Sequence, residues 1–407
     1  MKCGLLGRKL GHSYSPQIHN RLGSYPYSLF EKEPEEIQDF LRNGDFTGIN
    51  VTVPYKKDVI PFMDELTPTA MKMGAVNTIV RRNGKLIGHN TDYFGFLTMV
   101  RRSGLNVSGK KVLVLGSGGA SNTAVGVLEE LGANVVIISR SGGNNYSNLH
   151  LHADAAVIVN TTPVGMYPHT DDAPVDLSGF PCLEGVLDVI YNPARTKLLQ
   201  QAEERNIIAM NGLLMLVAQA KEAAEWFTAQ KISDNVIDPI HHELRQQMEN
   251  IVLVGMPGCG KSTVGSALAK TLGMTFMDAD SVLEARTGRT IPDIFASDGE
   301  AGFRLLETET LEYLGKKSGL VIATGGGCVT QKRNYPLLHQ NGSIFWLTRD
   351  LAKLPTDGRP LSQTTRMEDM YASRKSLYET FADHIIDNDG EPGETVSRIL
   401  AIWEKRK

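Results

Sequence analysis

Residues 255–262, "GMPGCGKS", have the residue types and the spacing of a phosphate-binding loop. They follow the apolar run "NIVLV" and precede "STVGSALAKTLG", which has the length and the pattern of a helix. In this context the glycines let backbone N–H groups close on phosphates, Lys261 reaches the outer phosphates, and Ser262 can bind magnesium. The sequence therefore predicts a site for ATP and Mg²⁺. The predicted ATP contacts are Gly255, Pro257, Gly258, Cys259, Gly260, Lys261, Ser262 and Thr263.

Acidic side chains follow this phosphate loop at the end of the next apolar stretch. Asp278 and Asp280 lie where one carboxylate can hold hydrated magnesium and the other can accept a hydroxyl proton. The segments "FMDADSVLEARTGRTIPDIFASDGEAGFRLLETE", "ATGGGCVT", "DGRPLS" and "SRKSLY" follow in that order. Together with the loop they resemble shikimate kinase over residues 250–407.

This resemblance implies a role for each charged group. It implies Asp278 with Ser262 as metal ligands and Asp280 as the catalytic contact to the ring hydroxyls of the acceptor. It further implies that Arg304 and Arg374 bind the substrate carboxylate, a task that suits a planar fork of donors.

The same resemblance covers a glycine run and a lid. Gly325, Gly326 and Gly327 would let the backbone approach the substrate ring. Arg359 would contact ATP from the lid and meet the charge that develops on the transferred phosphoryl group. The lid reads "RPLS", where the family often carries another leucine.

A second glycine loop lies earlier in the chain, at residues 116–120, "GSGGA", after the apolar run "KKVLVL". About 20 residues further on, where NAD-binding domains place an acidic group, this chain has Ser139 and Arg140. A cation there favours a 2′-phosphate and hence NADP. The following "SGGNN" lacks a further basic residue, so some use of NAD stays open.

The stretches around this glycine loop resemble shikimate dehydrogenase. They are "GHSYSPQIHN", "NVTVPYKK", "GAVNT" and "GHNTDYFGF" before it, and "NTTPVGM", "DVIYNPARTKLL" and "NGLLMLVAQ" after it. Reduction of a ring ketone needs a positioned acid beside the carbonyl, and Lys56 paired with Asp92 is the candidate. The resemblance implies substrate contacts by Ser13, Ser15, Asn50, Thr52, Asn77, Asp92, Tyr191 and Gln219. It implies cofactor contacts by Gly116, Gly118, Gly119, Ala120, Ser139, Arg140, Thr162 and Gly212.

The two halves together predict a bifunctional enzyme of the shikimate pathway. The first half would reduce 3-dehydroshikimate to shikimate with NADPH, and the second would phosphorylate shikimate at its 3-hydroxyl with ATP. Three alternatives stay open: a first half that prefers quinate, a ligand sensor built from pathway-enzyme domains, and a chain with one active and one structural half. Direct transfer of shikimate between the sites is a further hypothesis.

The apolar runs along the chain predict the elements that must position these residues. Runs such as "GINVTVP", "KVLVLG", "AAVIVNTT", "NIVLVG" and "SIFWLT" alternate with helix-length segments, which indicates an α/β fold built from βαβ units. A chain of 407 residues exceeds the usual size of one core. We expect a substrate domain at 1–95, completed by helices at 213–248, a Rossmann-like NADP domain at 96–212, and a P-loop kinase domain resembling nucleoside monophosphate kinases at 250–407.

Composition limits the remaining possibilities. A net charge of -4 gives no support for a nucleic-acid or membrane partner, so small-molecule substrates are the expected partners. The four cysteines lack CxxC spacing, and the first residues lack the apolar segment of a signal peptide, which favours a soluble cytoplasmic protein. Cys259, at a helix N-terminus, is a candidate for an oxidisable thiol, although a small side chain that fits a tight loop is the better explanation. Oligomeric state is not predicted.

Overall fold

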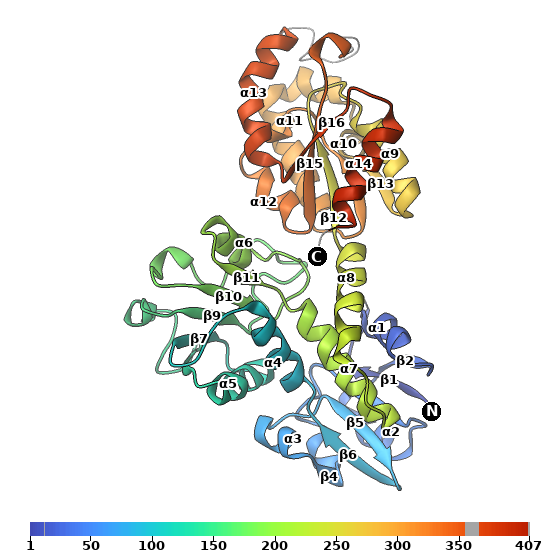
Figure 1. The fold of residues 1–407 in the computed structure, drawn as a ribbon, viewed down its shortest axis with the longest axis vertical. Helices are drawn as coiled ribbons and strands as arrows, with labels where there is room; N and C mark the ends of the chain where they lie inside the picture. The colour runs from blue at the N-terminus through green and yellow to red at the C-terminus, as the bar shows by residue number, and fades with distance from the viewer. Residues whose placement is uncertain (12, 355–365, 406–407) are drawn as a thin grey trace. The chain divides into compact units, whose positions relative to one another are not determined.

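The computed structural model describes residues 1–11, 13–354 and 366–405 (Figure 1). The chain divides into two compact units, of which the first comprises Met1–Tyr191 and Thr196–Leu244. The second comprises Asn192–Arg195 and Arg245–Lys407. Both units are α/β, as the alternation of apolar runs and helix-length segments predicts. In the described part of the chain, no helix is long and apolar enough to cross a membrane.

The first unit begins with a six-stranded mixed sheet in the order β2-β1-β3-β5-β6-β4. The pairs β1–β2, β1–β3 and β4–β6 are parallel, whereas β3–β5 and β5–β6 are antiparallel. Asn83 and Gly84, both with positive φ, form the tight turn between β5 and β6. The strands are β1 (Cys3–Gly7), β2 (Tyr27–Glu31), β3 (Gly48–Val51), β4 (Glu65–Leu66), β5 (Thr78–Arg82) and β6 (Lys85–His89). The helices of this region are α1 (Ser15–Leu22), α2 (Ile37–Asn43) and α3 (Pro68–Met73).

A second sheet in the first unit is entirely parallel, in the order β11-β10-β9-β7-β8. Apart from Lys111, the residues of its central strands β7 and β9 are buried, which is why these strands are continuous apolar runs in the sequence. The strands are β7 (Lys111–Leu115), β8 (Asn134–Ile138), β9 (Val157–Asn160), β10 (Gly185–Asp188) and β11 (Ile208–Met210). The helices are α4 (Asp92–Ser103), α5 (Gly119–Glu130), α6 (Lys197–Glu204), α7 (Leu213–Thr228) and α8 (Ile237–Met248).

Helix α7 returns the chain from the second sheet to the first. It packs against α4 and α1, and it also contacts β3 and β5 of the first sheet. Helix α7, which follows the parallel sheet in the sequence, thereby packs as part of the N-terminal region. Helix α8 then crosses the division between the two units, which falls between Leu244 and Arg245.

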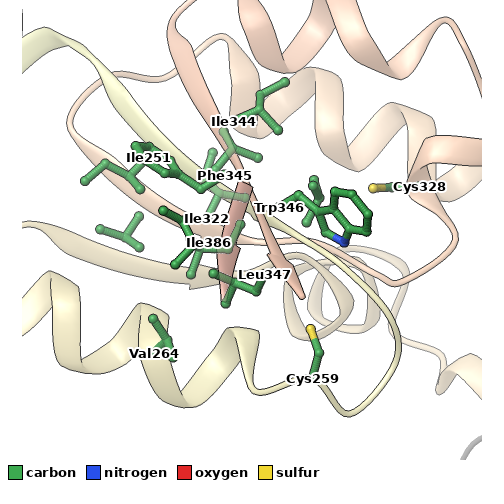
Figure 2. Packing of buried hydrophobic residues seen from close by; sticks show 14 of the residues in the cluster. Ile251, Cys259, Val264, Ile322, Cys328, Ile344, Phe345, Trp346, Leu347 and Ile386 are labelled. Carbon is green, nitrogen blue, oxygen red and sulfur yellow. The ribbon is translucent and has the colours of Figure 1, made fainter. Parts of the chain in front are cut away.

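The second unit is built on a five-stranded parallel sheet in the order β13-β14-β12-β15-β16. Figure 2 shows its core, a cluster of buried side chains that includes Ile251, Ile322, Phe345, Trp346 and Val264. The strands are β12 (Asn250–Val254), β13 (Thr275–Asp278), β14 (Leu320–Ala323), β15 (Gly342–Thr348) and β16 (His384–Asp387). The helices are α9 (Lys261–Leu272), α10 (Ala279–Thr287), α11 (Ile291–Gly315), α12 (Asn334–His339), α13 (Met367–Phe381) and α14 (Pro392–Trp403).

Candidate active sites

The first unit contains a cavity of about 210 Å³, the first cavity, at the carboxyl end of β3. Its wall combines hydroxyl and amide side chains with one ammonium group, from segments that are far apart in the sequence. The sequence-predicted residues on this wall are Ser13, Ser15, Asn50, Thr52, Lys56, Asn77, Tyr191 and Gln219. The fold therefore brings together the predicted substrate contacts, and Asp92 joins them through Lys56.

Lys56 and Asp92 form an ion pair beside this cavity. The Lys56 Nζ donates a hydrogen bond to Asp92 Oδ2 at 2.7 Å. The Asp92 side chain is only 6% exposed and begins helix α4, where the helix dipole stabilises a carboxylate. The Lys56 side chain is 27% exposed and lines the cavity. A buried anion thus orients an ammonium group that can reach a ligand.

The amide groups on the cavity wall are fixed by hydrogen bonds. The Asn77 Nδ2 donates to Gln219 Oε1 at 3.2 Å, and the Thr91 backbone N–H donates to Asn77 Oδ1 at 2.7 Å. The Tyr27 hydroxyl donates to Asn50 Oδ1 at 2.8 Å. These contacts set which end of each amide faces its neighbours. Such a preorganised polar wall discriminates strongly between ligands with different hydroxyl patterns.

His19 is a buried residue at this cavity that the sequence analysis did not single out. Its ring stacks on Tyr27 at a centroid distance of 4.1 Å, and its Nδ1 lies 2.7 Å from the Tyr25 hydroxyl oxygen. Burial lowers the pKa of His19 to about 3, against the raising effect of a hydrogen bond with Asn50. The ring is therefore neutral at neutral pH.

We expect His19 to make the stability of the protein depend on pH. Because the pKa of about 3 in the folded state lies below 6.5, the unfolded chain takes up a proton first as the pH falls. The contribution of the neutral His19 ring to the free energy of unfolding is complete above pH 6.5 and is lost as the pH falls toward 3. At pH 5 the loss amounts to about 2 kcal/mol. The free energy of unfolding should therefore differ less between pH 7 and pH 5 in His19→Phe than in the wild type, by that amount. Denaturant unfolding measures it, and an unchanged pH dependence would contradict the assignment.

The glycine loop at residues 116–120 joins β7 to α5. Gly116 has φ of +112°, and a Cβ there would lie 2.8 Å from Thr161 Oγ1, so only glycine fits without strain. Gly118 and Gly119 face open space, which leaves the backbone at the start of α5 accessible. Ala120 lies in the first turn of α5, Ser139 and Arg140 follow β8, and Gly212 precedes α7.

Thr162, another predicted cofactor contact, is held beside the glycine loop by buried groups. Its hydroxyl donates to Asn160 Oδ1 at 2.7 Å, and Asn160 Nδ2 donates to Asp188 Oδ1 at 3.0 Å. Burial raises the pKa of Asp188 to about 6, although hydrogen bonds from Ile190, Thr196 and Asn160 oppose the rise. Asn160 and Asp188 thus fix the loop that carries Thr162.

The second unit contains a larger cavity of about 520 Å³, the second cavity, between the phosphate loop and helix α11. Its wall combines residues predicted to bind ATP and Mg²⁺ with residues predicted to bind the acceptor. Those on its wall are Pro257, Gly258, Gly260, Lys261, Ser262, Thr263, Asp278, Asp280, Arg304, Gly325, Gly326, Gly327 and Arg374. Gly255 and Cys259 belong to the same loop but lie outside this wall as far as the described residues show. Arg359, predicted in the lid, lies outside the described residues.

Lys261 and Ser262 begin helix α9 directly after the loop. The Lys261 Nζ donates to the backbone oxygens of Gly255 and Met256 at 2.9 and 3.0 Å, so the ammonium lies over the loop. The Ser262 hydroxyl donates to Asp278 Oδ2 at 2.6 Å. A hydroxyl and a carboxylate oxygen, adjacent to a phosphate loop, are the ligand types that Mg²⁺ prefers.

Charged groups on the opposite wall of the second cavity are partly paired with one another. Burial and then the neighbouring Asp278 raise the pKa of Asp280. The Arg304 Nη1 donates to Glu307 Oε2 at 2.8 Å, and Arg374 Nη1 donates to the Gly326 carbonyl at 3.2 Å. The wall therefore offers a carboxylate near the phosphate loop and two guanidinium groups further away.

Comparison with known proteins matches both units. A model of the shikimate dehydrogenase substrate-binding domain matches residues 5–79, and a shikimate kinase model matches residues 257–404. The shikimate dehydrogenase (NADP(+)) of Clostridium perfringens (strain 13 / Type A) is 35% identical over 264 residues, which cover 60% of this chain and 97% of that protein. The chain belongs to the shikimate dehydrogenase family. With its kinase domain it is a bifunctional shikimate-pathway enzyme.

Solved structures agree for the dehydrogenase unit. Shikimate dehydrogenase 1 from Peptoclostridium difficile has 36% identity and a TM-score of 0.56, and covers 60% of this chain and 98% of its own. A chorismate mutase/shikimate 5-dehydrogenase fusion from Clostridium acetobutylicum has 33% identity and a TM-score of 0.58, covering 60% and 97%. Shikimate 5-dehydrogenase from Thermus thermophilus, in complex with NADP(H) and shikimate, has 27% identity and a TM-score of 0.54, covering 60% and 99%.

Among the described residues, seven on the wall of the second cavity were not predicted from the sequence: Glu284, Ile291, Pro292, Phe295, Phe303, Glu307 and Thr324. Glu307 pairs with Arg304, Phe295 and Phe303 form an apolar part of the wall, and their rings stack at 4.6 Å. "GEAGFRLLETE" shows Glu307 three residues after Arg304, the spacing of neighbours on a helix. That spacing was a usable signal for the ion pair.

The cysteines of this bifunctional enzyme differ sharply in exposure. Cys182 is exposed, whereas Cys3, Cys259 and Cys328 are buried. Burial raises the pKa of Cys3 to about 11 and that of Cys328 to about 12. Cys259 is 0% exposed, which removes the structural basis for an oxidisable thiol in the phosphate loop.

We expect iodoacetamide to label native protein at Cys182 alone, because the other thiols are out of reach of the reagent. Peptide mass spectrometry after brief labelling measures the modified positions. All four cysteines should react in denaturant. Labelling of Cys259 at the rate of Cys182 in the native protein would contradict the burial and restore the redox hypothesis.

Proposed function

We propose that the first unit reduces 3-dehydroshikimate to shikimate with NADPH and that the second unit phosphorylates shikimate at its 3-hydroxyl with ATP. The observation that carries the first assignment is the Lys56–Asp92 ion pair at the wall of a small polar cavity. For the second it is the phosphate loop, Asp280 and the two arginines around one cavity. The product of the first reaction is the acceptor of the second.

In the dehydrogenase, NADPH supplies the hydride, and the protein supplies the proton and the orientation of the ketone. The Lys56 ammonium donates its proton to the carbonyl oxygen, while Asp92 holds Nζ in place. Ser13 and Ser15 bind the substrate carboxylate. Asn50, Thr52, Asn77, Asp92 and Gln219 bind the ring hydroxyls, and Tyr191 borders the ring.

The glycine loop suits a dinucleotide. The open backbone at Gly118 and Gly119 and the start of α5 can accept a pyrophosphate, and Arg140, which is exposed after β8, can pair with a 2′-phosphate. NADP(+) in the name of the Clostridium perfringens relative supports this choice. The test is the ratio of kcat/KM for NADPH and NADH, which should favour NADPH.

In the kinase, ATP supplies the phosphoryl group, and the chain positions both reactants. Lys261 and the loop N–H groups bind the phosphates, and Ser262 and Asp278 hold Mg²⁺. Within the described residues no group of three or more His, Cys, Asp and Glu could hold a metal, so waters and phosphate oxygens would complete the coordination. Asp280 accepts the proton of the acceptor hydroxyl, and Arg304 and Arg374 bind the carboxylate.

The deciding experiment incubates the purified full-length chain with 3-dehydroshikimate, NADPH, ATP and Mg²⁺ and identifies the products by mass spectrometry. Shikimate 3-phosphate is the expected product. Without ATP the reaction should stop at shikimate, and without NADPH no shikimate should form. Absence of any conversion with all components would refute the dehydrogenase assignment. Absence of shikimate 3-phosphate when shikimate itself is supplied with ATP and Mg²⁺ would refute the kinase assignment. Faster turnover of quinate than of shikimate would support the alternative substrate.

A further inference from the structure

Arg304 of the kinase cavity has two carboxylate partners of very different character. Glu307 binds Nη1 at 2.8 Å and is only 3% exposed. Glu300 binds Nη2 at 3.1 Å, and its side chain is 56% exposed. One partner is therefore a permanent part of the wall, whereas the other stands at the solvent boundary, where ion pairs contribute little.

The backbone at Glu300 is also unlike that at Glu307. Gly299 has φ of +67° and ψ of -173°, which breaks helix α11 immediately before Glu300. Glu307 lies in the regular part of the helix that follows. Glu300 thus sits in the first turn after a break, where backbone N–H groups lack intrahelical acceptors.

The surroundings of Arg304 leave few ways to bind a further anion. One face of the guanidinium lies against Gly327, where a Cβ would come within 2.3 Å of Nη2. Nε is buried and has no hydrogen-bond partner among the described residues. An incoming carboxylate must therefore use the two Nη groups, where Glu307 already accepts from Nη1 and Glu300 from Nη2. Of these two carboxylates, Glu300 is the exposed one and can move into solvent, whereas Glu307 is buried.

We propose that Glu300 is an exchangeable counter-ion of Arg304, which the substrate carboxylate replaces when it binds. This inference rests on the proposed kinase function and adds a residue that sets the affinity for the acceptor. Two like charges cannot share Nη2 without repulsion, so part of the binding free energy is used to displace Glu300. Removal of its charge should tighten acceptor binding.

The test compares Glu300→Gln with Glu309→Gln in the full-length protein. Glu309 lies on the same helix and is exposed, so its replacement makes the same change of net charge away from Arg304. At low ionic strength Glu300→Gln should lower the KM for shikimate about 3- to 10-fold, with kcat changed less than twofold. Glu309→Gln should leave the KM within about 1.5-fold of the wild-type value.

Salt gives a second readout that a merely structural role would not change. The KM ratio between wild type and Glu300→Gln should shrink as ionic strength rises, because screening weakens the repulsion. A KM that rises in Glu300→Gln, or that matches Glu309→Gln, would overturn the inference. If the wild-type chain does not phosphorylate shikimate at all, the proposed function fails instead, which is a distinct outcome.

Discussion

Replacement of Lys56 by methionine should lower kcat/KM for 3-dehydroshikimate reduction about 10³- to 10⁴-fold. A general acid contributes about 10²- to 10⁴-fold, and the missing ammonium also leaves Asp92 as a buried carboxylate without its ion-pair partner. Because the side chain lengths are similar, the cavity keeps its shape. Reduction is followed by the loss of NADPH absorbance.

Lys57→Met is the matched control, since Lys57 is the adjacent lysine and is exposed. It should retain nearly full activity. Phosphorylation of shikimate by the same Lys56→Met preparation provides an internal control, because the kinase cavity lies in the other compact unit. Reduction by Lys56→Met within tenfold of the wild-type rate would mean that another group, or water, delivers the proton.

The sequence predicted which residues gather at each cavity much better than it predicted how they are held. Lys56 and Asp92 are 36 residues apart, and family resemblance rather than spacing pairs them. The pattern could not show that Asp92 is buried at the start of α4. His19 and Tyr27 were missed for a physical reason: a buried polar ring that is satisfied by its neighbours looks, in sequence, like any other aromatic or polar residue.

The sequence predicted some strands of the fold well and others not at all. Long apolar runs marked the central parallel strands, for example β12 and β15, because both faces of these strands are buried. The antiparallel strands β5 and β6 were not predicted, although Asn83-Gly84 between them is a recognised hairpin signal. Edge strands such as β13 are short and only partly buried, so their apolar pattern is weak.

Each unit has its own sheets, its own core and its own cavity, which makes the two activities separable by substitution. A variant that loses one reaction and keeps the other reports on one site only. For each catalytic variant, the activity of the other unit therefore serves as a control that the protein is folded. Detection of both activities would also exclude the interpretation of the chain as a ligand sensor.

Asp280→Asn should lower the kinase kcat about 10²- to 10⁴-fold, the range for loss of a general base. Asp280 lines the second cavity with Lys261 and Arg304, and an amide of nearly the same shape cannot accept the hydroxyl proton. Because burial and Asp278 raise the pKa of Asp280, the wild-type rate should fall as the pH falls through that raised value. A coupled assay for ADP over a pH series measures both effects.

Asp369→Asn is the control for this variant, since Asp369 is exposed on α13 and the change in charge is the same. It should keep the wild-type rate and pH profile, and both variants should retain dehydrogenase activity. If Asp280→Asn instead raises the KM for shikimate with little loss of kcat, Asp280 only binds the ring hydroxyls. Proton transfer would then pass directly to the phosphate oxygens, and positioning by Lys261, Arg304 and Arg374 would account for catalysis in this unit.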